Sequence, residues 1–160
     1  MPYIENVIGE DTKTPEVRLV EITMSNFEEC LLLSVHENQK GFGAPNSYSL
    51  SEAYADKVSQ PYAIYANEKM VGFLMYDYAS TEHMAYILRL MIDRRYQNKG
   101  YGERAMRILL QEIRNIVECR FIQISYHPGN TNAGKLYRSL GYEETEEFAD
   151  NGEIICRIKL

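Results

Sequence analysis

One succession of segments constrains this chain most: an apolar stretch, a basic segment broken by glycines, and an amphipathic stretch. Residues 87–93 read ILRLMID, and residues 94–102 read RRYQNKGYG. Glycines let the backbone approach an anion closely, and the start of a helix offers free N–H groups and the positive end of its dipole. The sequence therefore predicts a strand, a phosphate-binding loop and a helix in direct succession.

The glycine spacing excludes two familiar phosphate motifs. A Walker loop needs Gly-Lys followed by Ser or Thr, which is absent at the required spacing. A dinucleotide fingerprint needs Gly-x-Gly-x-x-Gly, and only Gly100-x-Gly102 is present. The loop by itself thus indicates either a phosphate site of another kind or a tight strand-to-helix turn with incidental arginines.

Periodicity and turn residues predict a mixed α/β fold in a single domain over residues 1–160, with residues 1–15 as a weakly ordered extension. Strands are expected at residues 17–22, 62–66, 69–78, 85–92, 120–126, 142–148 and 153–159. Helices are expected after a Ser25 cap, after a Ser49 or Ser51 cap, over residues 102–117, and from Asn130 or Thr131 to near Gly141. Asn151-Gly152 is expected to form a type I′ turn.

Composition narrows the class of function. The formal net charge of -6 argues against general nucleic-acid binding and is compatible with a cationic substrate. Cys30, Cys119 and Cys156 have no metal-ligand spacing, so we expect reduced thiols and no metal site. Neither a signal-type nor a membrane-spanning stretch is evident, which predicts a soluble cytoplasmic protein that does not bind a membrane.

A second motif follows one strand later. Residues 130–142 read NTNAGKLYRSLGY, which contains Asn-x-x-Ala-x-x-Leu-Tyr and a closing Gly-Tyr. This segment and the loop Gln97-x-x-Gly100-x-Gly102 together resemble the two cofactor motifs of the GNAT superfamily of acyl-CoA N-acyltransferases. The resemblance is good over residues 69–142, and the remaining elements follow the family's order. It implies a GNAT fold, with a central, mostly antiparallel β-sheet that splays where acetyl-CoA enters and is flanked by helices.

The resemblance also implies roles for individual residues. Backbone amides of the loop would hold the CoA pyrophosphate; these belong to Gln97, Asn98, Lys99, Gly100, Tyr101, Gly102 and Glu103. The pantetheine arm would pair with the strand at Leu90, Met91 and Ile92. Asn130 would hydrogen-bond the cofactor, and Lys135, Arg138 or Arg95 would meet the adenosine phosphates.

Tyr137 matches the family's usual general acid, and its chemistry suits that role. A phenol with a pKa of about 10 can protonate a departing thiolate whose conjugate acid has a pKa of about 8.5. The alternative is a core tyrosine that only packs. The base that takes the proton from the amine is left open among Glu82, His83, Glu37, Glu52 and a water chain.

The segment before residue 61 is similar to that of bacterial diamine and polyamine acetyltransferases of the spermidine/spermine type. A polyamine site needs carboxylates and aromatic faces, for which Glu37, Glu52, Tyr48 and Tyr54 are the candidates. We therefore expect N-acetylation of a small polyamine by direct attack in a ternary complex. Acetylation of a peptide, an antibiotic or an amino acid stays open, as does a non-catalytic CoA sensor. Dimers are common in the family, so a homodimer is also open.

Overall fold

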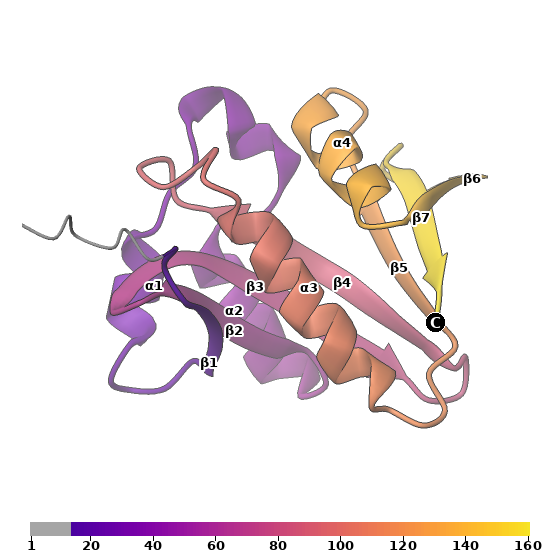
Figure 1. The fold of residues 1–160 in the computed structure, drawn as a ribbon, viewed down its shortest axis with the longest axis horizontal. Coiled ribbons are helices and arrows are strands. Elements are labelled where there is room, and N and C mark those ends of the chain that lie inside the picture. Colours follow the sequence, from indigo (N-terminus) through magenta and orange to yellow (C-terminus); the bar gives the residue numbers. More distant parts are fainter. Residues whose placement is uncertain (1–13) are drawn as a thin grey trace, which may run out of the picture.

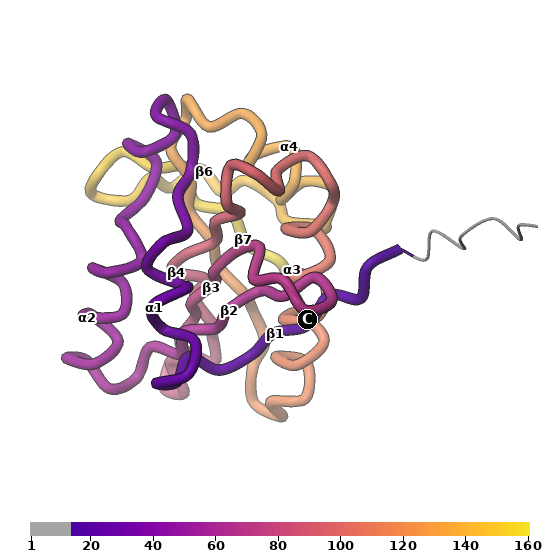
Figure 2. The backbone as a smooth tube through the Cα atoms, turned by 90° about the vertical axis from the view of Figure 1, so that its left-hand side faces the viewer, coloured from indigo at the N-terminus to yellow at the C-terminus, as the bar shows by residue number. Residues whose placement is uncertain are grey.

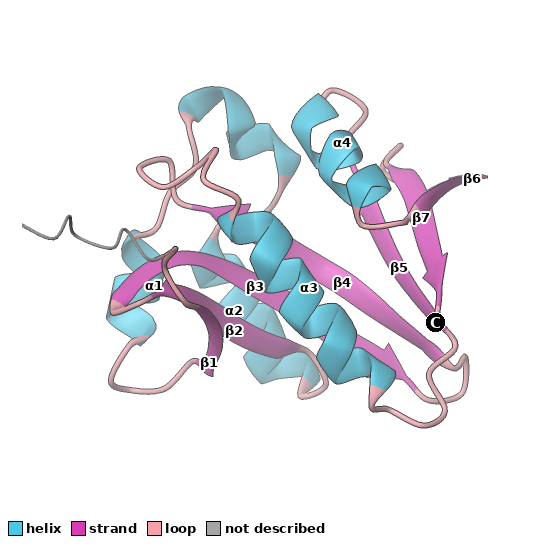
Figure 3. Ribbon diagram, viewed as in Figure 1, coloured by secondary structure: helices cyan, strands magenta, loops and turns pink. Residues whose placement is uncertain are grey.

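The computed structural model describes residues 14–160, so most of the predicted extension lies outside the described residues. The elements follow in the order β1 (Val17–Glu21), α1 (Phe27–Leu32), the 3₁₀ helix η1 (Glu37–Phe42), α2 (Asn46–Asp56), β2 (Gln60–Ala66), β3 (Lys69–Ala79), β4 (Met84–Ile92), α3 (Tyr101–Arg114), β5 (Phe121–Tyr126), α4 (Thr131–Ser139), β6 (Glu143–Phe148) and β7 (Ile154–Lys159). Figure 3 shows the helices and strands. The predicted mixed α/β fold is confirmed.

All seven strands form one sheet, in the order β1-β2-β3-β4-β5-β7-β6. Neighbouring strands run antiparallel except for β4 and β5, which are parallel. The predicted mostly antiparallel sheet is therefore confirmed. The single parallel pair marks the place where α3 crosses from one strand to the next, as a parallel connection requires.

The sheet splits between β4 and β5. These strands pair only from Met84 to Ile87 on β4, although β4 continues to Ile92. Leu88 is the extra residue of a β-bulge, because Met75 lies opposite Arg89 and Tyr76 opposite Ile87. A bulge bends its strand, so it turns the second half of β4 away from β5. Figure 1 shows the two strands diverging toward α4.

Helices cover both faces of the sheet, as the edge-on view shows (Figure 2). The apolar stripe of α3 buries Met106, Leu109 and Ile113 against one face, together with Tyr137 of α4. Helices α1 and α2 cover a smaller core around Cys30 and Phe73 on the other face. The cavity described below lies at the split, where neither layer closes the sheet.

Two predicted helix caps and one predicted turn were wrong. The N-cap position of α1 is Asn26 instead of Ser25, and the Asn26 side chain makes no cap hydrogen bond, because its Nδ2 donates to Glu21 O and its Oδ1 accepts from Thr23 N. Helix α2 begins at Asn46, before the predicted serine caps, because the buried Asn46 amide donates to Cys30 O at 3.0 Å.

The third is the Asn151-Gly152 connection, which is not a type I′ turn. Gly152 has a positive φ of 84° and its N–H donates to Ala149 O, but Asn151 does not have a positive φ. A type I′ turn needs positive φ at both central residues.

Candidate active site

A cavity of about 990 Å³ occupies the split between β4 and β5. Its wall comes from η1 and the loop after it, from β4, from the glycine loop, from β5 and α4, and from the turn between β6 and β7. Segments that are far apart in the sequence therefore meet in one space. The elements around this space are visible together in Figure 1.

The glycine loop closes one end of the cavity. Gly100 has a φ of 76° and directly precedes α3, whose start has no side-chain cap. The first N–H groups of α3 are thus free for a ligand. Gln97, Asn98, Gly100, Tyr101, Gly102 and Glu103 all line the cavity. The loop thus forms a cradle with free N–H donors, in which we expect a phosphate group to bind.

The free edge of β4 forms one side of the cavity. Leu90, Met91 and Ile92 line it beyond the last pairing with β5, so an extended ligand chain can lie beside them. Gly72 supports this edge from β3, because a Cβ there would lie 2.4 Å from Met91 O. Only glycine fits behind the strand without moving its backbone.

Asp93 anchors the loop at the end of β4. Its buried carboxylate accepts hydrogen bonds from Ser34 N at 2.9 Å, Arg95 N at 3.0 Å and Arg95 Nε at 2.8 Å. Burial by itself raises the pKa of Asp93, but these bonds outweigh it and the net pKa lies below its ordinary value. Arg95 is thereby engaged in holding the loop.

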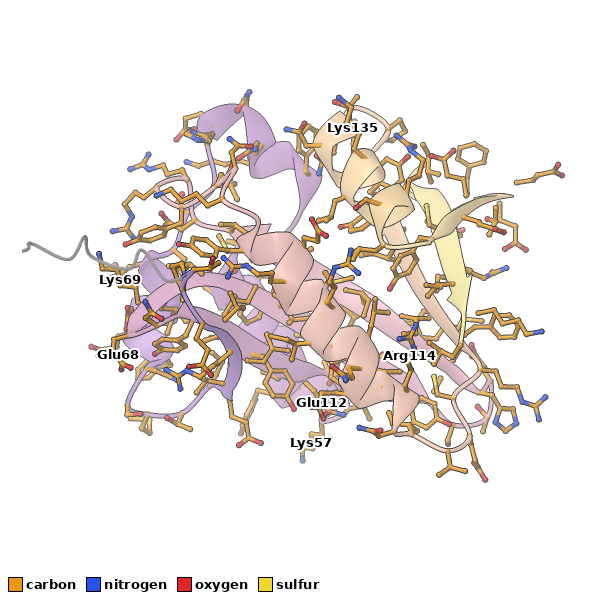
Figure 4. All side chains as sticks on the ribbon, in the orientation of Figure 1. Lys57, Glu68, Lys69, Glu112, Arg114 and Lys135 are labelled. Atoms are coloured by element: carbon orange, nitrogen blue, oxygen red, sulfur yellow. The ribbon has the colours of Figure 1, made fainter. Side chains whose placement is uncertain are left out.

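Four residues predicted to contact the cofactor do not line the cavity: Arg95, Lys99, Lys135 and Arg138. Arg95 pairs with Asp93, and the Lys99 ammonium lies 5.9 Å from the centre of the Tyr96 ring. Lys135 is exposed on α4 (Figure 4). Arg138, the third candidate for the adenosine phosphates, pairs with Glu144 at 2.8 Å.

Helix α4 brings the second motif to the cavity. The Asn130 side chain caps the helix by accepting from Ala133 N at 3.3 Å, and Asn130 also lines the cavity. Tyr137 is 6% exposed, lies against the rings of Tyr126 and Tyr142, and reaches the cavity wall. Among the described residues, no group hydrogen-bonds the Tyr137 hydroxyl.

Burial raises the pKa of Tyr137, and the negative charges that Cys156 and Glu153 can carry raise it further. The phenol therefore keeps its proton at neutral pH. A protonated hydroxyl without an internal partner, at the wall of a cavity, is available to donate to a ligand.

The four predicted substrate residues do not line the cavity. Glu37 pairs with Lys40 at 2.5 Å, and Glu52 pairs with Arg89 at 2.8 Å. Tyr48 and Tyr54 are 59% and 83% exposed.

Two further candidates for the base also lie outside the cavity wall. Glu82 accepts a hydrogen bond from the Tyr86 hydroxyl, and His83 Nδ1 contacts Glu118 O at 3.1 Å.

Several polar residues of the wall were missed, and two of them form a pair. Ser125 on β5 and Glu153 in the β6–β7 turn both line the cavity, and Ser125 Oγ donates to Glu153 Oε2 at 2.5 Å. In the sequence, Glu153 belongs to an acidic run typical of a solvated face. Its position follows from the pairing of Tyr126 with Ile154, which no local pattern predicts.

Comparison with known proteins decides the family, since the sequence model of the acetyltransferase (GNAT) family matches residues 20–142. The chain belongs to the GNAT family. It is an acetyl-CoA-dependent N-acetyltransferase, with acetyl-CoA as cosubstrate. The cradle at Gly100, the free edge of β4 and the volume of the cavity all fit a phosphorylated, extended cosubstrate.

Relatives of this GNAT chain include the spermine/spermidine N(1)-acetyltransferase of Bacillus subtilis strain 168. It is 28% identical over 143 residues, which cover 86% of this chain and 94% of the relative. The spermidine N-acetyltransferase of Vibrio cholerae, solved with CoA and spermine, superposes with a TM-score of 0.72 at 13% identity, over 90% of this chain and 94% of the other. The aminoglycoside acetyltransferase AAC(6')-Ib, solved with coenzyme A, has a TM-score of 0.75 at 16% identity, over 90% and 95% of the chains.

Two searches of the described residues complete the description of this GNAT domain. Within residues 14–160, no group of three or more His, Cys, Asp or Glu side chains is arranged to hold a metal ion. None of the helices in that range has the length and apolar character needed to cross a membrane.

Proposed function

We propose that this protein transfers the acetyl group of acetyl-CoA to a primary amine of a small polyamine of the spermidine or spermine type. One observation carries the proposal: the cavity joins an anion cradle at Gly100 to the free hydroxyl of Tyr137 along the open edge of β4. A site of this shape can hold an extended cosubstrate at one end and bring its reactive end to a proton donor.

The polyamine class is supported by the relatives. The Bacillus subtilis protein named for spermine and spermidine matches over 86% of this chain. The net charge of -6 is compatible with a polycationic acceptor, because an acidic protein attracts cations over distances of about a Debye length, roughly 8–10 Å.

Residues of the cavity wall have separate tasks in this proposal. The amides from Gln97 to Glu103 bind the pyrophosphate, and Leu90 and Ile92 align the extended arm by backbone hydrogen bonds. When bound, acetyl-CoA supplies a thioester that the amine attacks and a sulfur that leaves with the bonding electrons. The chain itself has only to position the two reactants and to move protons.

Tyr137 supplies the proton at the leaving side. Its hydroxyl donates to the sulfur as negative charge develops there, and a proton from the acylated nitrogen returns to the phenolate through water. The amine must be neutral when it attacks, so its first proton leaves to solvent through the open cavity. No covalent enzyme intermediate is needed, because the amine is itself the nucleophile.

The proposal is tested by following thiol release from acetyl-CoA with spermidine, spermine, putrescine, a lysine peptide and an aminoglycoside. We expect turnover with spermidine or spermine at a KM between about 1 µM and 1 mM, the usual range for enzymes. Turnover with only the peptide or the aminoglycoside would refute the polyamine class while leaving acetyl transfer in place. Binding of CoA without turnover of any amine would favour a sensor.

A further inference from the structure

The charged side chains of the cavity wall differ in whether the protein supplies a counter-ion for them. Four such residues line it: Lys40, Arg89, Glu103 and Glu153. The first three have counter-ions, which are Glu37 at 2.5 Å, Glu52 at 2.8 Å and Arg107 at 2.8 Å. Glu153 has no cationic side chain within 4.0 Å among residues 14–160. The cavity therefore contains one negative charge that the protein itself does not neutralise.

Glu153 is held in a defined position. Ser125 Oγ donates to its Oε2 at 2.5 Å, and its own backbone N–H donates to Asn151 Oδ1 at 3.1 Å. The next residue, Ile154, begins β7 and pairs with Tyr126. The second carboxylate oxygen, Oε1, accepts no hydrogen bond from the described residues. The side chain is thus oriented by one oxygen and leaves the other free for a ligand.

The surroundings of Glu153 suit an ammonium group. Tyr137 of α4, Gln123 of β5 and Tyr86 of β4 line the same cavity, and Tyr86 lies opposite Gln123 in the sheet. The two tyrosines are neutral and a tyrosine ring attracts a cation at its face, whereas the Gln123 oxygen already accepts a hydrogen bond from Arg157 Nε at 2.8 Å. The Glu153 charge also acts on Tyr137, because it contributes to the raised pKa of that phenol. Carboxylate and proton donor therefore share one space.

We propose that the Ser125–Glu153 pair is the binding site for the primary ammonium group of the acceptor. The inference rests on the proposed transfer to an amine. It replaces Glu37 and Glu52, whose carboxylates are already paired, with a carboxylate inside the cavity. A charge-assisted hydrogen bond from the ammonium to Glu153 Oε1 would bring the amine close to Tyr137 before it loses its proton.

The test is Glu153→Gln, which keeps an acceptor oxygen for Ser125 and removes only the charge. We expect the KM for the amine to rise about 10- to 100-fold, the range for losing a hydrogen bond to a charged group. The KM for acetyl-CoA and the Tm should stay unchanged. Calorimetric titration of spermidine into the CoA-saturated protein should show the same loss of affinity, independently of turnover.

Asp150→Asn is the matched control, since Asp150 is an exposed carboxylate on the same hairpin and does not line the cavity. It removes the same net charge and should leave the amine KM unchanged. Ser125→Ala is a second test variant. It removes the hydrogen bond that orients the Glu153 carboxylate but keeps the charge, so the amine KM should rise by less than in Glu153→Gln.

The outcomes separate this inference from the proposed function. If the wild-type protein acetylates only the peptide or the aminoglycoside, the polyamine class fails, and Glu153→Gln must then raise the KM for that amine. If Glu153→Gln leaves both KM and spermidine affinity within twofold of wild type, the ammonium site is refuted even where polyamine turnover is observed. A fall in Tm with unchanged KM would make Glu153 a structural tie between the hairpin and β5 and would also refute it.

Discussion

Gln39 and Gln97 exchange two side-chain hydrogen bonds at the wall of the cavity. Gln39 Nε2 donates to Gln97 Oε1 at 3.1 Å, and Gln97 Nε2 donates back to Gln39 Oε1 at 2.8 Å. Gln97 Nε2 also donates to Ile92 O at 3.0 Å, at the end of β4. The Ser34 backbone adds two hydrogen bonds to the same loop. Its N–H donates to Asp93 Oδ2, and its carbonyl accepts from Arg94 N. The segment around η1 is therefore fastened to the loop that would hold the cosubstrate.

Gln39→Ala should raise the KM for acetyl-CoA and for the amine together, because it releases η1 and the loop from each other. The expected loss is about 1 kcal/mol, or roughly fivefold in each KM, as for a neutral hydrogen bond. Steady-state kinetics with each substrate varied in turn measures both values. Gln111→Ala, on the exposed face of α3, is the control. A change in only one of the two constants would contradict the coupling.

Tyr137→Phe should lower kcat at least about 100-fold, since a general acid contributes typically that much or more. Affinity for CoA should change by less than twofold, because the ring and its contacts with Tyr126 and Tyr142 remain. Tyr142→Phe is a matched control, as the buried Tyr142 hydroxyl has no hydrogen-bond partner. That variant should retain activity. Equal losses in the two variants would assign Tyr137 a packing role only.

Gly134→Ala should destabilise the fold although alanine is the better helix former. A Cβ at Gly134 would lie 2.8 Å from the Tyr126 hydroxyl oxygen and 2.9 Å from the ring carbon that carries it. Tyr126 also lies in edge contact with the Tyr137 ring and donates to Glu144 at 2.7 Å, so it cannot move away freely. The overpacking cost of about 1–3 kcal/mol exceeds the gain in helix propensity of about 1 kcal/mol.

Urea unfolding monitored by circular dichroism measures this effect. Gly41→Ala is the comparison, because a Cβ there meets no atom within 4 Å. The prediction fails if the two variants are equally stable.

Asp93 should make the protein sensitive to acid. In the folded protein the pKa of Asp93 lies below its ordinary value of 3.8. Its contribution to the free energy of unfolding is therefore complete above that value and is lost as the pH falls through the lower folded pKa. Asp93→Asn should therefore cost about 2 kcal/mol at neutral pH, the size of a hydrogen bond to a charged group. The difference between wild type and variant should shrink below about pH 4.

Thermal unfolding from neutral pH down to about pH 3 measures that difference. Asp150→Asn, on the exposed turn, is the comparison variant over the same range. A constant gap between wild type and Asp93→Asn at every pH would contradict the assignment.

Local patterns predicted several elements around the site. The amphipathic helix α3, the loop that ends at Gly100 and Asn130, one of the two expected caps of α4, were all read from spacing and residue type. Each depends on residues within one or two turns of chain, so the signal is present in the sequence. The same holds for the strands expected at residues 62–66 and 69–78, which pair as β2 and β3.

Predictions for long charged side chains were less successful. Arg95 and Arg138 were expected to meet the adenosine phosphates, yet they pair with Asp93 and Glu144. Charge alone does not set the direction of a long side chain. Glu52 likewise has the expected residue type and is neutralised by Arg89.

By itself, the sequence determined the family and the order of elements, and it pointed to the glycine loop and to Tyr137, which both line the cavity, because these rest on short-range spacing and on motifs. Only the tertiary structure decided which carboxylate of the acidic C-terminal run lines the cavity. Ser125 and Glu153 are separated by 28 positions and meet because β7 pairs with β5. Strand pairing is set by the packing of the whole sheet, so no local pattern in the acidic C-terminal run distinguishes Glu153 from its solvent-facing neighbours.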